Sequence, residues 1–360
     1  MNDKKSILFV NNIPSLYRKC LFENIIKLSP SYSINVEFDY LSASESVRDW
    51  NSVDLSNYER IYKVLYQSRN KKTPTSDYII NYGYLSRVFS KEVVVYFGYN
   101  YTTYLISGFT RKLFGKKNVL FCETTNNDTD QSLFKKITKR FLLRFIFDRY
   151  IVPGCASKDY LCYLGIDPLL IYKAPNSSEL RPFNMAEIRT TRTPIRLLFV
   201  GRLSEEKNIL NMISTLKSSD FNFNLSIVGT GPQQSKVKDL IKGKSNFNYL
   251  GGQTPDELKS IFSEHDVLIL PSKAEPWGLV VNEAINFGLA VLVSNSVGCH
   301  HELVRNNGEI FCNTKDDFLG KLHLIINNLE DYSAESIKLS KTYTAQYQAS
   351  CFLKSLETLL

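Results

Sequence analysis

Residues 267–283 read Val267-Leu-Ile-Leu-Pro-Ser-Lys-Ala-Glu-Pro-Trp-Gly-Leu-Val-Val-Asn-Glu283. The apolar run 267–270 predicts a short buried strand, and the proline and glycine that follow predict a turn. A second apolar run then predicts a helix. Because open α/β sheets bind ligands at the carboxyl ends of their strands, this order places a turn and a helix N-terminus at a ligand edge. The unpaired amides and positive dipole end of such a helix suit a phosphate.

Two carboxylates bracket this turn, Glu275 and Glu283. We expect Glu275 on the loop that faces the ligand and Glu283 about one turn into the helix. Carboxylate oxygens are strong hydrogen-bond acceptors, so both residues suit the recognition of sugar hydroxyls. Each residue alone would more often be an ordinary surface acid, and only the combination indicates a site.

A second strand, turn and helix surround Gly201-Arg-Leu-Ser-Glu-Glu-Lys207. This order predicts that Arg202 and Lys207 lie at the same ligand edge. Two fixed cations there could neutralise a diphosphate leaving group without a metal ion. A third connection, Gly229-Thr-Gly-Pro232, predicts a tight turn after another strand.

Together with Leu250-Gly251, these motifs resemble the donor half of a family 4 glycosyltransferase, in order and spacing, over roughly residues 196–305. The resemblance implies an α/β GT-B fold, in which two Rossmann-like domains face each other across a cleft. It also implies a nucleotide-diphosphate sugar as co-substrate in the C-terminal domain, no other cofactor, and transfer with retention of anomeric configuration.

The resemblance assigns roles to single residues. Arg202 and Lys207 would hold the donor phosphates, Glu283 the ribose and Glu275 the transferred sugar. Further donor contacts are expected at Gly229, Gly231, Gly278 and Leu279.

In the first domain, the loop after the predicted strand 7–10 ends in Tyr17 and Arg18, the candidate acceptor contacts. Relatives often carry a glycine pair in this loop, which is absent here. Relatives also often carry a histidine near the transferred sugar, whereas all four histidines of this chain lie in its C-terminal half. Glu123, in Phe121-Cys-Glu-Thr124, takes that place, and a carboxylate could stabilise an oxocarbenium-like transition state. Catalysis is therefore expected to depend on Glu275, Glu123, Arg202 and Lys207.

A chain of 360 residues with 43% hydrophobic and 22% charged residues is typical of a soluble two-domain protein. We expect an acceptor domain over 1–183, a linker over 184–194, a donor domain over 195–342 and a helix over 343–360 that packs back on the first domain. Seven scattered cysteines, no signal peptide and no long apolar run predict a cytoplasmic protein. Asp128-Thr-Asp130 matches a metal-binding pattern of another glycosyltransferase fold, but so short a match arises by chance, and no metal is expected.

Positive charge is concentrated in the first half, where residues 1–184 hold 26 Lys and Arg against 17 Asp and Glu. Within it, Phe134, Ile137, Phe141 and Phe145 share one helical face, surrounded by basic residues. Such a helix can lie on an anionic membrane surface, here the inner face of the membrane, or can pack its apolar face into the core. Both interpretations remain open from the sequence. No nucleic-acid-binding module is recognisable.

The leading hypothesis is a retaining glycosyltransferase that adds a sugar to a saccharide acceptor, expected to be lipid-linked, in cell-surface polysaccharide synthesis. Two alternatives share the architecture: a nucleotide-sugar epimerase and a non-catalytic subunit that binds a sugar nucleotide. The missing histidines of the first domain argue against the epimerase, whereas binding alone could explain the donor motifs of a non-catalytic subunit.

Overall fold

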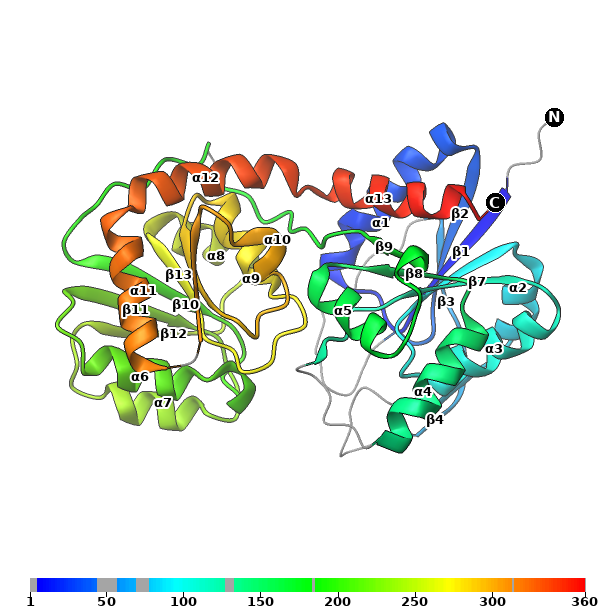
Figure 1. The fold of residues 1–360 in the computed structure, drawn as a ribbon, viewed down its shortest axis with the longest axis horizontal. Coiled ribbons are helices and arrows are strands. Elements are labelled where there is room, and N and C mark those ends of the chain that lie inside the picture. Colours follow the sequence, from blue (N-terminus) through cyan, green and yellow to red (C-terminus); the bar gives the residue numbers. More distant parts are fainter. Residues whose placement is uncertain are drawn as a thin grey trace.

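The computed structural model describes residues 5–43, 57–68, 78–126, 133–182, 185–312 and 314–359. Two α/β domains lie next to each other, each built on a parallel sheet covered by helices (Figure 1). The predicted architecture of two Rossmann-like domains is therefore confirmed. Among the helices described, none has the length and apolar character needed to cross a membrane.

The first domain contains a seven-stranded sheet in the order β3-β2-β1-β6-β7-β8-β9, with every pairing parallel. Its strands are β1 (Lys5–Asn11), β2 (Ile34–Tyr40), β3 (Glu59–Ile61), β6 (Val93–Phe97), β7 (Lys117–Phe121), β8 (Arg149–Val152) and β9 (Ile171–Lys173). A separate antiparallel pair consists of β4 (Val64–Ser68) and β5 (Tyr78–Asn81). The helices are α1 (Leu16–Leu28), η1 (Ser29–Tyr32), α2 (Tyr84–Ser90), α3 (Thr102–Leu113), α4 (Leu133–Ile146), α5 (Cys155–Tyr163) and η3 (Pro168–Leu170).

The second domain contains a six-stranded parallel sheet in the order β12-β11-β10-β13-β14-β15. Its strands are β10 (Ile195–Val200), β11 (Phe223–Val228), β12 (Phe247–Gly251), β13 (Val267–Leu270), β14 (Ala290–Ser294) and β15 (Gly308–Phe311). The helices are η4 (Glu205–Lys207), α6 (Ile209–Lys217), α7 (Gln234–Ile241), α8 (Pro255–Glu264), α9 (Leu279–Asn286), α10 (His300–Leu303), α11 (Lys315–Asn327) and α12 (Leu329–Thr342). The strand order reverses between β10 and β13, and doubly wound sheets bind ligands at that point.

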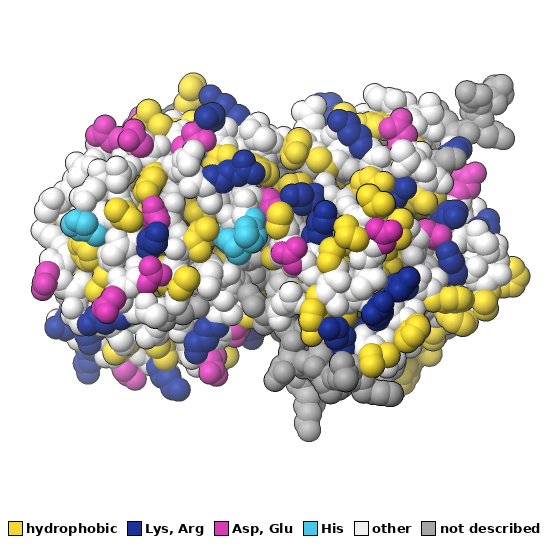
Figure 2. Space-filling view, viewed as in Figure 1, with side chains coloured by type: hydrophobic (Ala, Val, Ile, Leu, Met, Phe, Trp, Pro, Cys, Tyr) yellow, Lys and Arg dark blue, Asp and Glu magenta, His cyan; other side chains and the backbone are white. Residues whose placement is uncertain are grey.

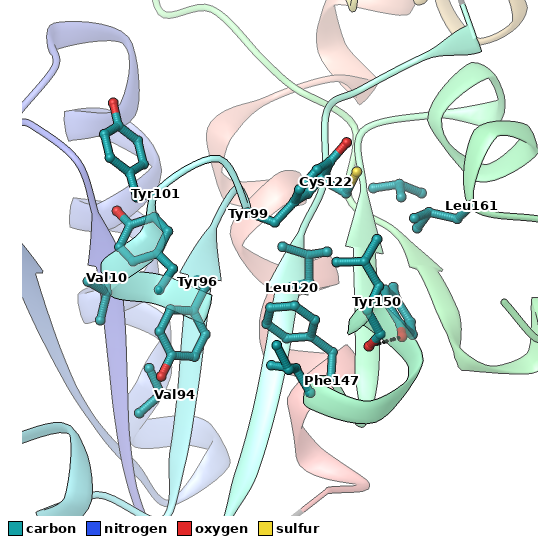
Figure 3. Close-up of a cluster of buried hydrophobic side chains, with 14 of the residues drawn as sticks. Val10, Val94, Tyr96, Tyr99, Tyr101, Leu120, Cys122, Phe147, Tyr150 and Leu161 are labelled. Atoms are coloured by element: carbon teal, nitrogen blue, oxygen red, sulfur yellow. Dashed lines mark hydrogen bonds between the residues drawn. The ribbon is translucent and has the colours of Figure 1, made fainter. Parts of the chain in front are cut away.

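Both faces of the first sheet are buried, as expected for a parallel sheet. Along β6, Val94 and Tyr96 belong to one core cluster, and Val93 and Val95 belong to the cluster on the opposite face. Figure 3 shows Tyr96 and Leu120 beside Phe147, just beyond α4, and the Tyr150 hydroxyl donates a hydrogen bond of 2.9 Å to a carbonyl of α4. The sheet is thereby tied to α4.

The last helix, α13 (Ala345–Glu357), leaves the second domain and lies along α1 of the first (Figure 1). Phe352 of α13 stacks on Phe97, with ring centroids 6.0 Å apart. The described part of the segment expected as a linker lies on the second domain, because the Arg189 guanidinium donates to the Phe287 carbonyl at 2.9 Å. The domains are thus joined by two passages of the chain.

Candidate functional site

The loops that follow β10 and β13 meet where the strand order of the second sheet reverses. Lys207, at the end of η4, forms an ion pair with Glu275 of the second loop. The backbone N–H of Lys273 donates to the Glu206 carbonyl at 2.7 Å, which joins the same two loops. Two residues predicted separately for the donor site are therefore in contact.

The loop that carries Glu275 is held by the segment after β14. The Gly298 N–H donates to the Glu275 carbonyl at 2.8 Å, and the Cys299 N–H donates to the Trp277 carbonyl at 2.9 Å. A Cβ at position 298 would lie 1.9 Å from the Pro276 carbonyl oxygen, so only glycine fits. Gly278, with φ of 95°, ends this loop and is the N-cap of α9. Leu279 follows as the first residue of that helix.

The glycine turn after β11 allows a close contact with the loop after β10. A Cβ at Gly229 would lie 1.9 Å from the Gly201 carbonyl oxygen, and one at Gly231 would lie 2.5 Å from the Leu203 carbonyl oxygen. The Leu203 N–H also donates to the Thr230 carbonyl at 2.9 Å. The two glycines thus have a packing role, whatever contact they make with a donor.

Arg202 extends from the loop after β10 into solvent and forms no ion pair with any residue that the structure describes. Lys207, in contrast, is largely buried and paired. An exposed guanidinium and a partly buried ammonium group from the same loop offer two different kinds of phosphate contact, because a guanidinium binds bidentately and an ammonium acts as a point charge.

Glu283 lies in α9 with its side chain facing Ser178 of the connector, which we define as residues 174–182. Burial raises the pKa of this carboxyl to about 7, although a hydrogen bond with Ser178 partly offsets the effect. Within the described part of the chain, it has no ion-pair partner. A carboxylate with few donors around it is suited to accept hydrogen bonds from a ligand.

The structure brings together two first-domain residues that were predicted separately. A guanidinium nitrogen of Arg18 lies 2.7 Å from Oε2 of Glu123, and Asn176 Nδ2 donates to Oε1 at 2.8 Å. The guanidinium also lies over the Phe97 ring, 4.5 Å from its centroid. Both carboxylate oxygens of Glu123 are thus engaged by the protein itself.

Two expectations fall on parts of the chain that the structure does not describe. Tyr17 belongs to α1, but its side chain is outside the described set. The segment Asp128-Thr-Asp130 lies wholly outside the described residues. Over the residues that are described, no group of three or more His, Cys, Asp or Glu side chains could hold a metal ion.

Several polar residues of this region were missed from the sequence. Glu302 of α10 is buried, and its Oε1 accepts a hydrogen bond of 2.8 Å from the Cys155 N–H at the start of α5. Asn282 of α9 joins Trp277 to Asn176 of the connector. No periodicity reveals such residues, since their partners lie more than 100 positions away or on another element.

The apolar stripe on α4 faces solvent, so the interpretation that it packs into the core is wrong. Phe141 is 69% exposed, and Leu143 and Ile146, which lie off the stripe, are the residues that enter the core. We call the exposed hydrophobic set of α3 and α4, with Phe114, the α3–α4 apolar surface. It comprises Ile106, Phe109, Leu113, Phe114, Ile137, Phe141 and Phe145.

The α3–α4 apolar surface is surrounded by positive charge. The Phe109 and Phe145 rings, one from each helix, lie 5.2 Å apart, so the surface is continuous across both helices. Neither helix contains an Asp or Glu, whereas both carry Lys and Arg. Figure 2 shows hydrophobic side chains gathered at the edge of the first domain where these helices lie.

Residues 181–338 match the family described as glycosyl transferases group 1. The O-antigen biosynthesis glycosyltransferase WbnH of Escherichia coli is 29% identical over 159 residues, which are 44% of this chain and 45% of that protein. A glycogen synthase of Mycobacterium tuberculosis is 30% identical over 141 residues, 38% of this chain and 34% of that protein. The chain spans at most about half the length of these curated relatives.

Two solved structures share the fold over almost the whole chain. The apo form of the lipopolysaccharide outer core galactosyltransferase WaaB superposes with a TM-score of 0.74 at 16% identity, over 99% of this chain and all of that one. Anabaena Alr3699/HepE in complex with UDP has a TM-score of 0.72 at 14% identity, over 98% of this chain and all of that one. These proteins therefore support the predicted fold along both domains.

Proposed function

We propose that this chain, whose residues 181–338 match the glycosyl transferases group 1, transfers a sugar from a nucleotide-diphosphate sugar to a saccharide acceptor, with retention of configuration. The observation that carries this proposal is the contact between Lys207 and Glu275 where the strand order reverses. A cation for the leaving group and an acceptor for sugar hydroxyls stand side by side there.

In the proposed mechanism, negative charge grows on the diphosphate as its bond to the anomeric carbon breaks. Lys207 and Arg202 stabilise that charge, and because Lys207 is already held by Glu275 in the loop after β10, its ammonium group needs little reorganisation. Glu275 orients the transferred sugar through its hydroxyls. Glu283 accepts hydrogen bonds from the ribose, and Gly278 and Leu279 present the backbone at the start of α9. Glu123, held by Arg18 and Asn176, faces the reaction from the first domain.

We propose a lipid-linked saccharide as the acceptor. The names of similar proteins support this choice, since they refer to O-antigen biosynthesis and to the lipopolysaccharide outer core. The α3–α4 apolar surface supports a peripheral location on the inner face of the membrane, because an exposed apolar patch with a basic border suits an anionic lipid surface.

The proposal is tested by thermal shift with UDP-, GDP- and ADP-linked sugars without added metal. Stabilisation by one nucleotide class in the wild type and its reduction in Glu283→Ala are expected. Glu330→Ala, which removes an exposed carboxylate of α12, is the matched control and retains the full shift. No shift with any nucleotide at millimolar concentration would overturn the donor site.

Product analysis separates the alternatives. A transferase releases the nucleoside diphosphate when an acceptor extract is added. An epimerase instead converts the sugar without release, and a binding subunit does neither. Release that depends on the acceptor is the expected result.

A further inference from the structure

Asn176 of the connector forms hydrogen bonds with three separate parts of the molecule. Its Nδ2 donates to Glu123 after β7 at 2.8 Å, and its Oδ1 accepts from Gln348 of α13 at 2.9 Å. Its backbone carbonyl accepts from Asn282 of α9, also at 2.9 Å. First domain, last helix and donor domain therefore meet at one residue.

Asn282 continues these contacts into the donor loop. Its side chain is 1% exposed, and its Oδ1 accepts a hydrogen bond of 2.7 Å from Trp277 Nε1. Trp277 is 4% exposed and lies two positions after Glu275. An unbroken series of hydrogen bonds thus runs from Glu123 through Asn176 and Asn282 to the loop of Glu275.

The chemistry of the partners permits one orientation of each amide. An indole nitrogen only donates and a backbone carbonyl only accepts, so Asn282 must direct Oδ1 to Trp277 and Nδ2 to Asn176. A carboxylate only accepts, so Asn176 must direct Nδ2 to Glu123. If either amide were reversed, a donor would face a donor or an acceptor would face an acceptor. Such unpaired polar groups are costly in a buried setting.

The same loop also contacts the first domain through packing. A Cβ at Gly154, before α5, would lie 2.8 Å from the Trp277 ring. The indole therefore sits against the first-domain backbone while its nitrogen is held from α9. Its position is determined from both domains.

We propose that Asn282 and Asn176 are positioning residues that hold Trp277, and with it Glu275, in place relative to Glu123. This inference rests on the proposed function, since it concerns the reactive groups of that site. Neither asparagine needs to touch the nucleotide. Loss of the series lowers turnover and leaves the affinity for UDP nearly unchanged, because Arg202 and Lys207 belong to the loop after β10, which forms none of the hydrogen bonds of the series.

Asn286 provides a matched control. It lies one turn further along α9, is 4% exposed, and its Nδ2 donates to the Ser178 and Leu180 carbonyls at 3.0 and 2.9 Å. Asn286→Ala therefore removes a buried amide that binds the same connector from the same helix. Neither of these two hydrogen bonds involves the donor loop.

The chain has two tryptophans, Trp50 and Trp277. The experiment therefore uses the full chain with Trp50→Phe, so that all tryptophan emission comes from Trp277. Asn282→Ala is expected to red-shift the emission of Trp277 and to lower turnover at least tenfold, while the thermal shift produced by UDP is retained. Asn286→Ala is expected to leave the emission wavelength of Trp277 unchanged and turnover within twofold of the parent. Asn282→Asp keeps the acceptor for the indole and is expected to preserve the emission.

Trp277→Phe provides a second test, since it keeps an aromatic ring but removes the Nε1–H donor together with the five-membered ring of the indole. It is expected to lower turnover with unchanged UDP binding. Equal emission and equal turnover in Asn282→Ala and Asn286→Ala would overturn the proposal. Failure of the parent to bind UDP would instead count against the proposed function, and the emission comparison would still test the hydrogen-bond series.

Discussion

The carboxylate of Glu302 in the second domain accepts a hydrogen bond of 2.8 Å from the backbone N–H of Cys155 in the first domain. The Glu302 carboxylate thus lies against the N-terminus of α5, where the unpaired amides and the positive end of the helix dipole favour a negative charge. Lys173 of β9 is 3.6 Å from the same oxygen. A single buried acid therefore joins two elements of one domain to the other domain.

Glu302→Ala is expected to destabilise the protein by about 1–3 kcal/mol, because it leaves the partly buried Cys155 N–H without its acceptor. Urea unfolding followed by far-UV circular dichroism measures the change. Glu264→Ala, which removes an exposed carboxylate of the same domain, is the control and should be nearly neutral. A Glu302→Ala protein as stable as the control would contradict the assignment.

Glu283 predicts a pH dependence of stability. Its folded-state pKa is raised by burial to about 7, well above the unfolded value, so the folded state binds more protons between these two values. The free energy of unfolding therefore falls as pH rises through this window. Glu283→Gln removes the free-energy cost of ionising this buried carboxyl. The variant should therefore be more stable than wild type at pH 8, by about 3 kcal/mol at most. The advantage should vanish at pH 4, and equal stability at both pH values would show that the carboxyl is not perturbed.

The same carboxyl predicts that nucleotide affinity rises with pH. Ribose hydroxyls donate to the ionised form, so the Kd for UDP should fall between pH 6 and pH 8. Isothermal titration calorimetry of wild type and Glu283→Gln measures this. The variant should bind weakly with a flat profile, and a flat wild-type profile would argue against contact with the ribose.

Lys207→Met is expected to lower turnover by about 100- to 1,000-fold, the effect of removing one preorganised group that stabilises transition-state charge. Glu275→Gln should lower turnover while UDP binding is retained, because Glu275 is assigned to the sugar. Steady-state release of UDP from the preferred donor measures the turnover of both variants. Lys217→Met, on the outer helix α6, is the matched control. A Lys207→Met enzyme with normal turnover would exclude the proposed role.

The α3–α4 apolar surface predicts binding to anionic vesicles. Phe141→Ser with Phe145→Ser should weaken sedimentation with phosphatidylglycerol vesicles, and high salt should weaken it further, because basic residues contribute about 1 kcal/mol each near such a surface. Leu324→Ser, in the second domain, replaces a residue as exposed as Phe145, at 44%, and should have no effect. Equal binding of all variants would contradict the proposal.

Gly229→Ala tests the turn after β11, and Gly320→Ala, in α11, is its comparison. Gly229→Ala forces a Cβ to within 1.9 Å of the Gly201 carbonyl oxygen and should destabilise the protein by several kcal/mol. Gly320→Ala, inside α11 with open space around it, should stabilise by about 0.5–1 kcal/mol through backbone entropy. Thermal melts of the two proteins should therefore move in opposite directions.

The placement of the two loops that we propose bind the donor could be predicted because it is local. A strand followed by a glycine turn and a helix puts Arg202 and Glu275 at the same edge of any parallel sheet. Glu123 and Arg18 were also predicted, but as independent residues. Their ion pair joins the loop after β7 to α1, and no spacing in the chain encodes that contact.

The spacing of apolar residues could not predict which face of α4 enters the core. Phe141 belongs to a regular apolar stripe, whereas Leu143 and Ile146 interrupt the pattern. The sheet buries the second set, because β7 and β8 and the neighbouring α3 determine which side of the helix is covered. A helix that is apolar on two sides has no orientation until its neighbours are in place.

By itself, the sequence determined the α/β class, the two domains and the position of the two loops that we propose bind the donor, because strand, turn and helix signals act over a few residues. Tertiary structure alone decided three relationships: the Lys207–Glu275 contact, the raised pKa of Glu283 and the series from Glu123 to Trp277. Each depends on distance or burial between segments far apart in the chain. The energy of such contacts exists only after the backbone has brought the partners together.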